Sequence, residues 1–253
     1  MQLTMLGVGS SAGTPQIGCN CATCLSTNPK NKRTRCSAVI TTPTGEVILI
    51  DTGPDLRTQA LREGFTRVDA VLYTHTHADH LHGIDDLRAF CQINRKQIPL
   101  YAKLDAKEHI AAKFAYAIRE PSDFWDMPVL SLNEITQPFD LFGLAITPLY
   151  VKHGRSEILG FRINNIAYLT DVSEIPEDAL QALSNLEYLM LDCLRYKPHH
   201  THINVEQSLA YAGQIKAKQT YLMHMTHEIE YEDLSAKLPE NVYLAYDGLK
   251  LDV

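Results

Sequence analysis

The feature that most constrains this chain is a cluster of metal-binding side chains directly after an apolar strand. The predicted strand ends at residues 70–73, and four donors follow within six positions: His75, His77, Asp79 and His80. Residues two apart on an extended backbone point to the same side, so His75 and His77 can share one metal. Asp79 and His80 lie where the chain turns toward a helix and can reach a second point. Single surface histidines are the structural alternative, but four such donors at this density predict a metal centre.

The remainder of the chain predicts a mixed α/β protein in which the same pattern occurs twice. Strands are predicted over residues 38–42, 47–51, 68–74, 144–151, 158–163, 167–170, 188–191, 220–224 and 242–245, and helices over residues 55–63, 177–183 and 205–217. Two sheets packed back to back with helices outside would form a four-layer αβ/βα sandwich. No linker interrupts the chain, so a single domain over residues 1–253 is expected, with one irregular loop at 120–127.

Composition and charge exclude some classes of binding partner. The 253 residues carry a formal net charge of −7, which argues against the broad basic surface that a large nucleic-acid partner needs. The longest apolar runs, at residues 47–50 and 188–191, are far shorter than the roughly 20 residues of a membrane span. The first residues lack the basic and apolar segments of a signal peptide, so we expect a cytoplasmic protein without membrane association.

The histidine cluster carries a family resemblance. Residues 75–80, HTHADH, match the H-x-H-x-D-H motif, and the chain therefore resembles the metallo-β-lactamase superfamily, whose fold is an αβ/βα sandwich. Residues 50–53 resemble the first motif of that superfamily, in which the aspartate, here Asp51, holds the histidine loop by accepting an imidazole N–H. Three further residues resemble later motifs in the same order along the chain: His153, Asp171 and His224.

The resemblance implies a centre of two divalent metals that share one carboxylate. The implied ligands are His75, His77, His153 and Asp171 for one metal, and Asp79, His80, Asp171 and His224 for the other. Imidazole and carboxylate donors suit zinc or manganese, and the set contains no thiolate that would select zinc. Taken singly, His153, Asp171 and His224 are weak signals, because a lone histidine or aspartate at a strand end is more often a cap or a surface group.

A second metal site is indicated by three closely spaced cysteines in the predicted loop 18–36. Cys19, Cys21 and Cys24 offer three thiolates, one fewer than a closed structural zinc site needs. His227, three residues after His224, is free to complete a Cys₃His site. The alternative is a set of reduced bystander thiols with a solvated histidine. In a reducing compartment a disulfide framework is not expected.

Together, the cysteine cluster and the histidine motif resemble a narrower family, the phosphoribosyl cyclic phosphodiesterases of the carbon–phosphorus lyase pathway. The match includes Gly18, Arg33-x-Arg35, Asp247-Gly248 and His202. In that family the histidine equivalent to His202 acts as general acid beside the metal-site aspartate, here Asp79. A leaving alkoxide needs such a proton. His199 and His200 stand close enough in sequence to be alternative donors.

Several other residues receive no functional role. Cys36, Cys91 and Cys193 are expected to be buried small apolar residues. His82 and His109 are expected in core or surface positions, and Arg88 to be a salt-bridging surface residue rather than a phosphate ligand.

The resemblance implies hydrolysis of a small cyclic phosphate or a nucleotide-like phosphodiester by a hydroxide held between two metals, with a histidine as general acid. Two alternatives stay open: an endonuclease of the tRNA 3′-end-processing type, and a non-catalytic binding protein of the pyrroloquinoline quinone biosynthesis protein B type. The expected partner is a small-molecule phosphodiester, and a homodimer is a possible assembly.

Overall fold

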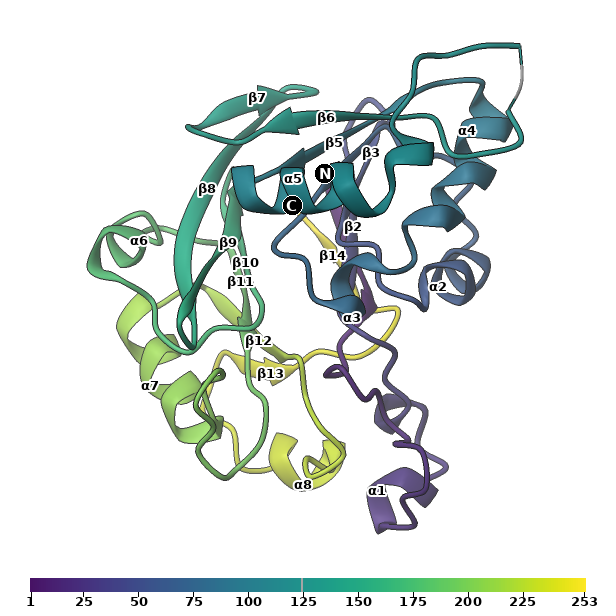
Figure 1. Ribbon diagram of the computed structural model, residues 1–253. Helices are drawn as coiled ribbons and strands as arrows, with labels where there is room; N and C mark the ends of the chain where they lie inside the picture. The colour runs from purple at the N-terminus through teal and green to yellow at the C-terminus, as the bar shows by residue number, and fades with distance from the viewer. Residues whose placement is uncertain (124) are drawn as a thin grey trace. The chain divides into compact units, whose positions relative to one another are not determined.

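Two seven-stranded mixed sheets, one in each of two units, organise the chain in the computed structural model (Figure 1). The structure describes residues 1–123 and 125–253. Unit 1 comprises residues 1–6, 37–136 and 250–253, and unit 2 comprises residues 7–36 and 137–249. None of the helices in these described residues is long and apolar enough to cross a membrane.

The sheet of unit 1 has the strand order β14-β1-β2-β3-β4-β5-β6. Its strands are β1 (Gln2–Gly7), β2 (Ser37–Thr41), β3 (Val47–Ile50), β4 (Ala70–Leu72), β5 (Ile98–Ala102), β6 (Leu130–Glu134) and β14 (Lys250–Asp252). Strands β3 to β6 pair in parallel, whereas β2 pairs with β3 and β14 with β1 in antiparallel fashion. The carboxyl ends of β3 and β4 therefore lie at one edge, where Asp51 and the histidine motif follow.

Helices of unit 1 cover one face of this sheet. They are α2 (Leu56–Glu63), α3 (Ala78–Leu81), α4 (Leu87–Asn94) and α5 (Leu104–Lys113), with short 3-10 turns η2 (Ile84–Asp86) and η3 (Ala115–Ala117). Val47, Leu49 and Val71 from the strands share one core with Leu56 and Phe90 from the helices. Each fully buried side chain of this size contributes about 1.5–3 kcal/mol, so the core holds the strand ends in place.

The sheet of unit 2 has the order β13-β12-β11-β10-β9-β8-β7. Its strands are β7 (Phe139–Leu141), β8 (Leu144–His153), β9 (Ser156–Ile163), β10 (Ile166–Leu169), β11 (Tyr188–Asp192), β12 (Gln219–Met223) and β13 (Val242–Leu244). Strands β10 to β13 are parallel, and β8 runs in the same direction because two antiparallel pairings, β8 with β9 and β9 with β10, separate it from β10. Five carboxyl ends thus lie at one edge of this sheet.

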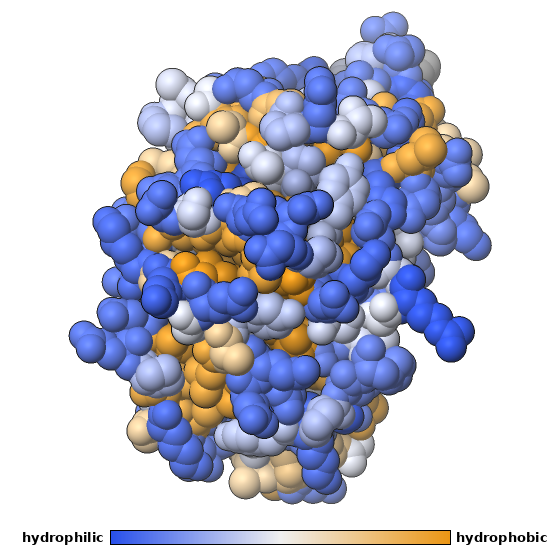
Figure 2. All heavy atoms as spheres, turned by 90° about the vertical axis from the view of Figure 1, so that its left-hand side faces the viewer, coloured by the Kyte–Doolittle hydropathy of each residue, from blue (hydrophilic) through white to orange (hydrophobic). Residues whose placement is uncertain are grey.

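Unit 2 also contains short helices and the cysteine loop. The helices are α1 (Ala22–Leu25), α6 (Glu177–Gln181), α7 (Val205–Ile215) and α8 (Tyr231–Ser235), with the 3-10 turn η1 (Pro29–Asn31). Helix α6 packs against β8, and α8 packs against β13. On the face shown in Figure 2, polar residues alternate with apolar patches.

The predicted strands and helices are confirmed, with ends that shift by one or two residues in most cases. The predicted strand 68–74 is shorter, because pairing with β3 covers only Ala70–Leu72 and the chain then enters the histidine loop. The prediction omitted β1, β5, β6, β7 and β14. Pro99 inside β5 and the three-residue lengths of β7 and β14 weaken their local signals. The described residues of loop 120–127 form no helix or strand, and Phe124 lies outside the described residues.

Candidate metal centre and its supporting groups

Unit 1 holds the four donors of the histidine motif on one short segment that runs from the end of β4 into α3. The ring centroid of His75 lies 4.6 Å from that of His77 and 4.3 Å from that of His80. Nε2 of His80 lies 3.3 Å from Oδ2 of Asp79. His75 and His80 are buried and His77 is exposed. The segment therefore gathers imidazole and carboxylate groups as a divalent metal requires.

The fully buried carboxylate of Asp51 supports this segment. Oδ1 accepts a hydrogen bond from the Thr74 backbone N–H at 2.8 Å, and Oδ2 accepts one from the Thr74 hydroxyl at 2.8 Å. Oδ2 also lies 2.8 Å from Nδ1 of His80. Because an ionised carboxylate only accepts, His80 donates its Nδ1–H and presents Nε2. Burial raises the pKa of Asp51, while His80 and Thr74 oppose that shift.

A close backbone contact fixes the end of α3 against the turn after β3. The Thr52 backbone N–H donates to the His80 carbonyl at 2.7 Å, and the Gly83 N–H donates to the Thr52 carbonyl at 2.8 Å. A Cβ at Gly83 would lie 2.1 Å from the Gly53 carbonyl oxygen, so only glycine fits. The motif residues 50–53 thus hold the histidine segment by backbone contacts as well as through Asp51.

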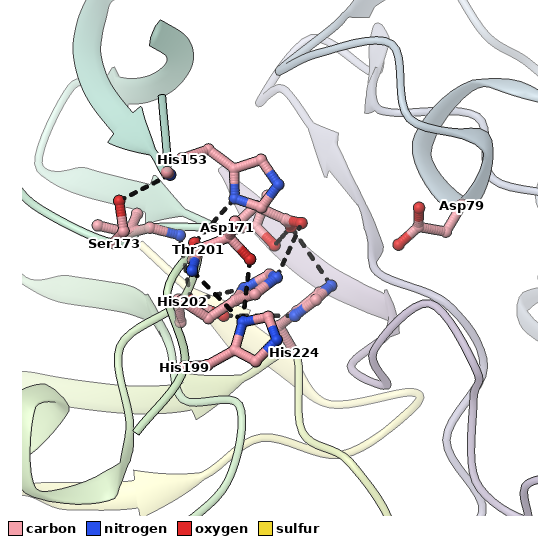
Figure 3. Close-up of polar contacts among 12 residues, drawn as sticks. Asp79, His153, Asp171, Ser173, His199, Thr201, His202 and His224 are labelled. Atoms are coloured by element: carbon pink, nitrogen blue, oxygen red, sulfur yellow. Dashed lines mark hydrogen bonds and ion pairs between the residues drawn. The ribbon is translucent and has the colours of Figure 1, made fainter. Parts of the chain in front are cut away.

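Unit 2 places its donors at the shared carboxyl edge of its sheet (Figure 3). His153 ends β8, Asp171 follows β10, and His224 follows β12. Nε2 of His224 lies 3.3 Å from Oδ1 of Asp171. Nδ1 of His153 lies 2.9 Å from the Thr201 carbonyl oxygen; because a carbonyl only accepts, His153 presents Nε2. The three predicted donors of this half, distant in sequence, lie at the ends of every second strand, β8, β10 and β12, along this edge.

Three buried residues at strand ends adopt left-handed backbone conformations. Asp51, Asp171 and His224 have φ values of 60°, 57° and 58°. Such conformations are unfavourable for residues other than glycine, by about 1–3 kcal/mol each, and they concentrate at functional sites. Here each one turns the chain sharply out of its strand and directs a metal-type or supporting side chain along the sheet edge.

His202 lies in a segment that packs between two of these strand ends. The Ile203 backbone N–H donates to the Val172 carbonyl at 2.6 Å, and the Leu194 N–H donates to the Ile203 carbonyl at 3.1 Å. Directly after it, Asn204 and Gln207 form a capping box that begins α7. Nε2 of His202 lies 3.9 Å from Oδ2 of Asp171. This segment positions the imidazole beside the carboxylate.

The two neighbouring histidines occupy different environments. His200 is exposed, and His199 is partly buried with Nδ1 3.0 Å from the Thr201 hydroxyl. Burial, followed by the nearby His202, lowers the pKa of His199. Only His202 among the three is buried, with 8% of its surface exposed. The geometry favours His202 as the proton donor, a role that stays a prediction.

The sequence analysis missed Asp192, a fully buried carboxylate at the end of β11. Its Oδ2 lies 3.1 Å from Nδ1 of His202, and its Oδ1 lies 3.4 Å from Nδ1 of His224. The available signal was its position, since Asp192 directly follows the apolar run 189–191 just as Asp51 follows 47–50.

The cysteine cluster comes together with its predicted histidine in unit 2. One ligand atom from each of Cys19, Cys21, Cys24 and His227 lies within 4.8 Å of the others. Nδ1 of His227 lies 3.3 Å from Sγ of both Cys19 and Cys21. The hydrogen bond from His227 lowers the pKa of the Cys21 thiol to about 6, whereas burial raises the pKa of Cys24. Three thiols and an imidazole fit a structural zinc site.

Buried Arg33 braces the loop that carries His227. Its guanidinium donates to the Thr226 carbonyl at 3.0 Å and to the Ile229 carbonyl at 2.8 Å, on both sides of the histidine. Burial lowers its pKa to about 10. Arg33 was part of the family match but had no assigned role, and these hydrogen bonds give it a structural one.

Comparisons with known proteins show the family of this chain. The family model described as the beta-lactamase superfamily domain matches residues 46–225. A solved diphosphatase from the PhnP family is 41% identical, with a TM-score of 0.93, and the match covers 100% of this chain and 97% of that one. The chain belongs to the PhnP family of the β-lactamase superfamily. The predicted resemblance and the predicted metallo-β-lactamase fold class are thereby confirmed.

Two further similar proteins match this chain, one over only part of its own length and one at low sequence identity. An octanoyltransferase from Porphyromonas gingivalis (strain ATCC BAA-308 / W83) is 38% identical over 99% of this chain. The chain spans about half the length of that curated relative, 51%. Zinc-bound PqqB from Methylobacterium extorquens is 21% identical with a TM-score of 0.81, covering 100% of both chains, and shows the fold alone.

The three cysteines without a predicted functional role are buried, as expected. Cys36, Cys91 and Cys193 are fully buried thiols, and burial raises the pKa of Cys193 to about 12. His82 is exposed and His109 is partly buried. Arg88 is exposed, as predicted, and its guanidinium donates to the Asp126 backbone carbonyl at 3.5 Å, whereas its salt bridge stays a prediction.

Proposed function

We propose that this chain is a metal-dependent phosphodiesterase that hydrolyses a small cyclic phosphate or a nucleotide-like phosphodiester. The observation that carries the proposal is the setting of His202. Its Nδ1 is held by Asp192, and its Nε2 lies 3.9 Å from the Asp171 carboxylate. An imidazole so placed is suited to protonate a leaving oxygen. The similar PhnP-family protein, described as a diphosphatase, supports hydrolysis at phosphorus.

The proposal includes two divalent cations, zinc or manganese. His75, His77, His153 and Asp171 would hold one, and Asp79, His80, Asp171 and His224 the other. The support is the order of the motifs along the chain and the chemistry of the donors, which are imidazoles and carboxylates. When bound, such a pair of cations activates water and offsets the charge on phosphoryl oxygens.

The chain's own groups would orient the donors and move the proton. Asp51 and the Thr201 carbonyl each accept an Nδ1–H, so His80 and His153 present Nε2. His202 would give its proton to the leaving oxygen beside Asp171. A ribose hydroxyl is a poor leaving group, and a positioned acid accelerates its departure by about 10²–10⁴-fold.

We further propose that Cys19, Cys21, Cys24 and His227 hold a structural zinc. Four donors of this kind form a closed site, which contributes to folding rather than to the reaction. The single domain predicted over residues 1–253 is part of this proposal, with the zinc loop at 18–36.

A diphosphate is the second candidate substrate, because the similar PhnP-family protein is described as a diphosphatase. Hydrolysis of a phosphoanhydride uses the same metals but releases a phosphate that needs less protonation than an alkoxide. The two candidates therefore differ in how strongly they depend on His202.

The test is a hydrolysis profile measured with metal content on the same sample. Nucleoside cyclic phosphates, linear diesters, a nucleoside diphosphate and a lactone would be compared at equal enzyme concentration, before and after chelator treatment. We expect chelator-sensitive turnover of a phosphodiester. Turnover of the lactone alone, or phosphodiester turnover that survives removal of all metal, would contradict the proposal.

A further inference from the structure

The carboxylate of Asp192 makes contacts that neither the motifs nor the proposed metal ligands explain. It is fully buried at the end of β11, and its Oδ2 is hydrogen-bonded while its Oδ1 faces a second imidazole at a longer distance. Oδ2 accepts the Val172 backbone N–H at 3.1 Å and lies 3.1 Å from Nδ1 of His202. Oδ1 lies 3.4 Å from Nδ1 of His224. One carboxylate therefore faces two different imidazoles.

These contacts favour one tautomer for both rings. An ionised carboxylate has no proton to give, so the His202 Nδ1 that is hydrogen-bonded to it carries the hydrogen. The same tautomer in His224 would direct an Nδ1–H toward Oδ1 of Asp192 and leave Nε2 for a metal. Both Nε2 atoms are then directed to the other side, where they lie 3.9 Å and 3.3 Å from the Asp171 oxygens. The two rings stack with centroids 4.8 Å apart and an interplanar angle of 12° (Figure 3).

We propose that Asp192 is the positioning residue that sets the orientation and tautomer of His202 and His224 together. This inference rests on the proposed function, in which His224 binds a metal and His202 donates a proton. A single buried side chain would then couple the metal site to the acid. Asp51 differs, because its carboxylate accepts a hydrogen bond from one histidine, His80, and its other hydrogen bonds come from Thr74.

The arrangement predicts unequal effects of one isosteric change. In Asp192→Asn, the amide oxygen is expected at the Oδ2 position, because the Val172 N–H and the His202 Nδ1–H both need an acceptor there. The amide NH₂ would then face Nδ1 of His224, which must become an acceptor and move its proton to Nε2. His224 would lose its metal-binding lone pair, whereas His202 would keep its tautomer.

The first experiment reads the tautomers and the metal directly in the full-length zinc-loaded protein. Long-range ¹H–¹⁵N spectra should show Nδ1–H for both rings in the wild type and the Nε2–H form for His224 in Asp192→Asn. Zinc affinity by chelator competition should fall by about 10–100-fold at the active site. Ser208→Ala is the matched control, because the Ser208 hydroxyl donates to the backbone carbonyls of Asp192 and Asn204 rather than to the Asp192 carboxylate. An unchanged His224 tautomer and unchanged zinc affinity in folded Asp192→Asn would overturn the inference.

The second experiment separates this inference from the proposed function. The rate ratio between a nitrophenyl diester and an alkyl diester should stay near the wild-type value in metal-saturated Asp192→Asn and should rise in Asp192→Ala, which releases both rings. An equal rise in both variants would overturn the assignment of Oδ2 to His202. If the wild type hydrolyses no phosphodiester, the proposed function fails, while the tautomers and zinc affinity still decide the role of Asp192.

Discussion

The histidine segment of unit 1 and the strand-end cluster of unit 2 both present imidazole and carboxylate donors, but they position these donors in different ways. Unit 1 takes four donors from residues 75–80 and supports them with Asp51, which follows the neighbouring parallel strand. Unit 2 takes three donors from β8, β10 and β12 and supports them with Asp192 and the Thr201 carbonyl. In both, a buried carboxylate after an apolar strand accepts from a histidine Nδ1.

The two units differ in which groups would be disturbed by removing the supporting carboxylate. Removing Asp51 releases His80 and the Thr74 backbone, all within the metal-binding segment. Removing Asp192 releases a proposed ligand and the proposed acid at once. Unit 1 would therefore govern metal binding, and unit 2 would govern metal binding and proton transfer together. Four substitutions test that division.

The largest loss of activity is expected for Asp171→Ala. This carboxylate is proposed to serve both cations, so its removal should reduce kcat by more than the roughly 10–100-fold typical of a supporting residue. Arg88→Ala is the control, because Arg88 is exposed in unit 1. Rates and metal content would be measured on both. Equal residual rates in the two variants, with metal content unchanged, would contradict the proposal that Asp171 binds both cations.

The next effect is expected for His202→Ala, and it should depend on the leaving group. Hydrolysis of an alkyl phosphodiester should slow by about 10²–10⁴-fold, whereas a nitrophenyl diester, whose leaving group needs no proton, should slow far less. His200→Ala is the control, since His200 is exposed. If the leaving-group dependence appeared in His200→Ala instead, the acid would be the neighbouring residue.

A smaller effect is expected for Asp51→Asn, confined to metal binding. Losing the acceptor for His80 should weaken metal affinity by about 10–100-fold, and saturating metal should restore most of the rate. The leaving-group ratio should not change, unlike in Asp192→Ala. Asp69→Asn is the control, because Asp69 accepts from the Val47 N–H and pairs with Arg67 without contacting a histidine. A changed leaving-group ratio in Asp51→Asn would contradict the proposal that unit 1 affects metal binding alone.

The smallest effect on rate is expected for Cys21→Ser, which should act on stability. Loss of a thiolate ligand should lower zinc content and thermal stability while the active-site metals stay largely bound. For a chain of this size, each 1 kcal/mol lost lowers Tm by roughly 2–4 °C. Cys91→Ser is the control, since Cys91 is buried in the core of unit 1 and should destabilise without zinc loss. Full zinc retention in Cys21→Ser would contradict the structural site.

The sequence by itself determined the fold class, the histidine motif and the cysteine cluster. Alternating and continuous apolar runs are local signals, and residues 75–80 and 19–24 bring their donors together within a few positions. The more distant donors, His153, Asp171 and His224, could be identified only through the order of family motifs, because each one alone resembles an ordinary strand-end residue.

Only the tertiary structure decided which groups support those donors. Asp192 reaches His202 and His224, 10 and 32 positions away, because β10, β11 and β12 pair in parallel and bring their carboxyl ends to one edge. The Thr201 carbonyl reaches His153 across 48 positions. Such contacts have no local pattern, since a buried carboxylate or carbonyl gains its partner from strand pairing between segments far apart in the chain.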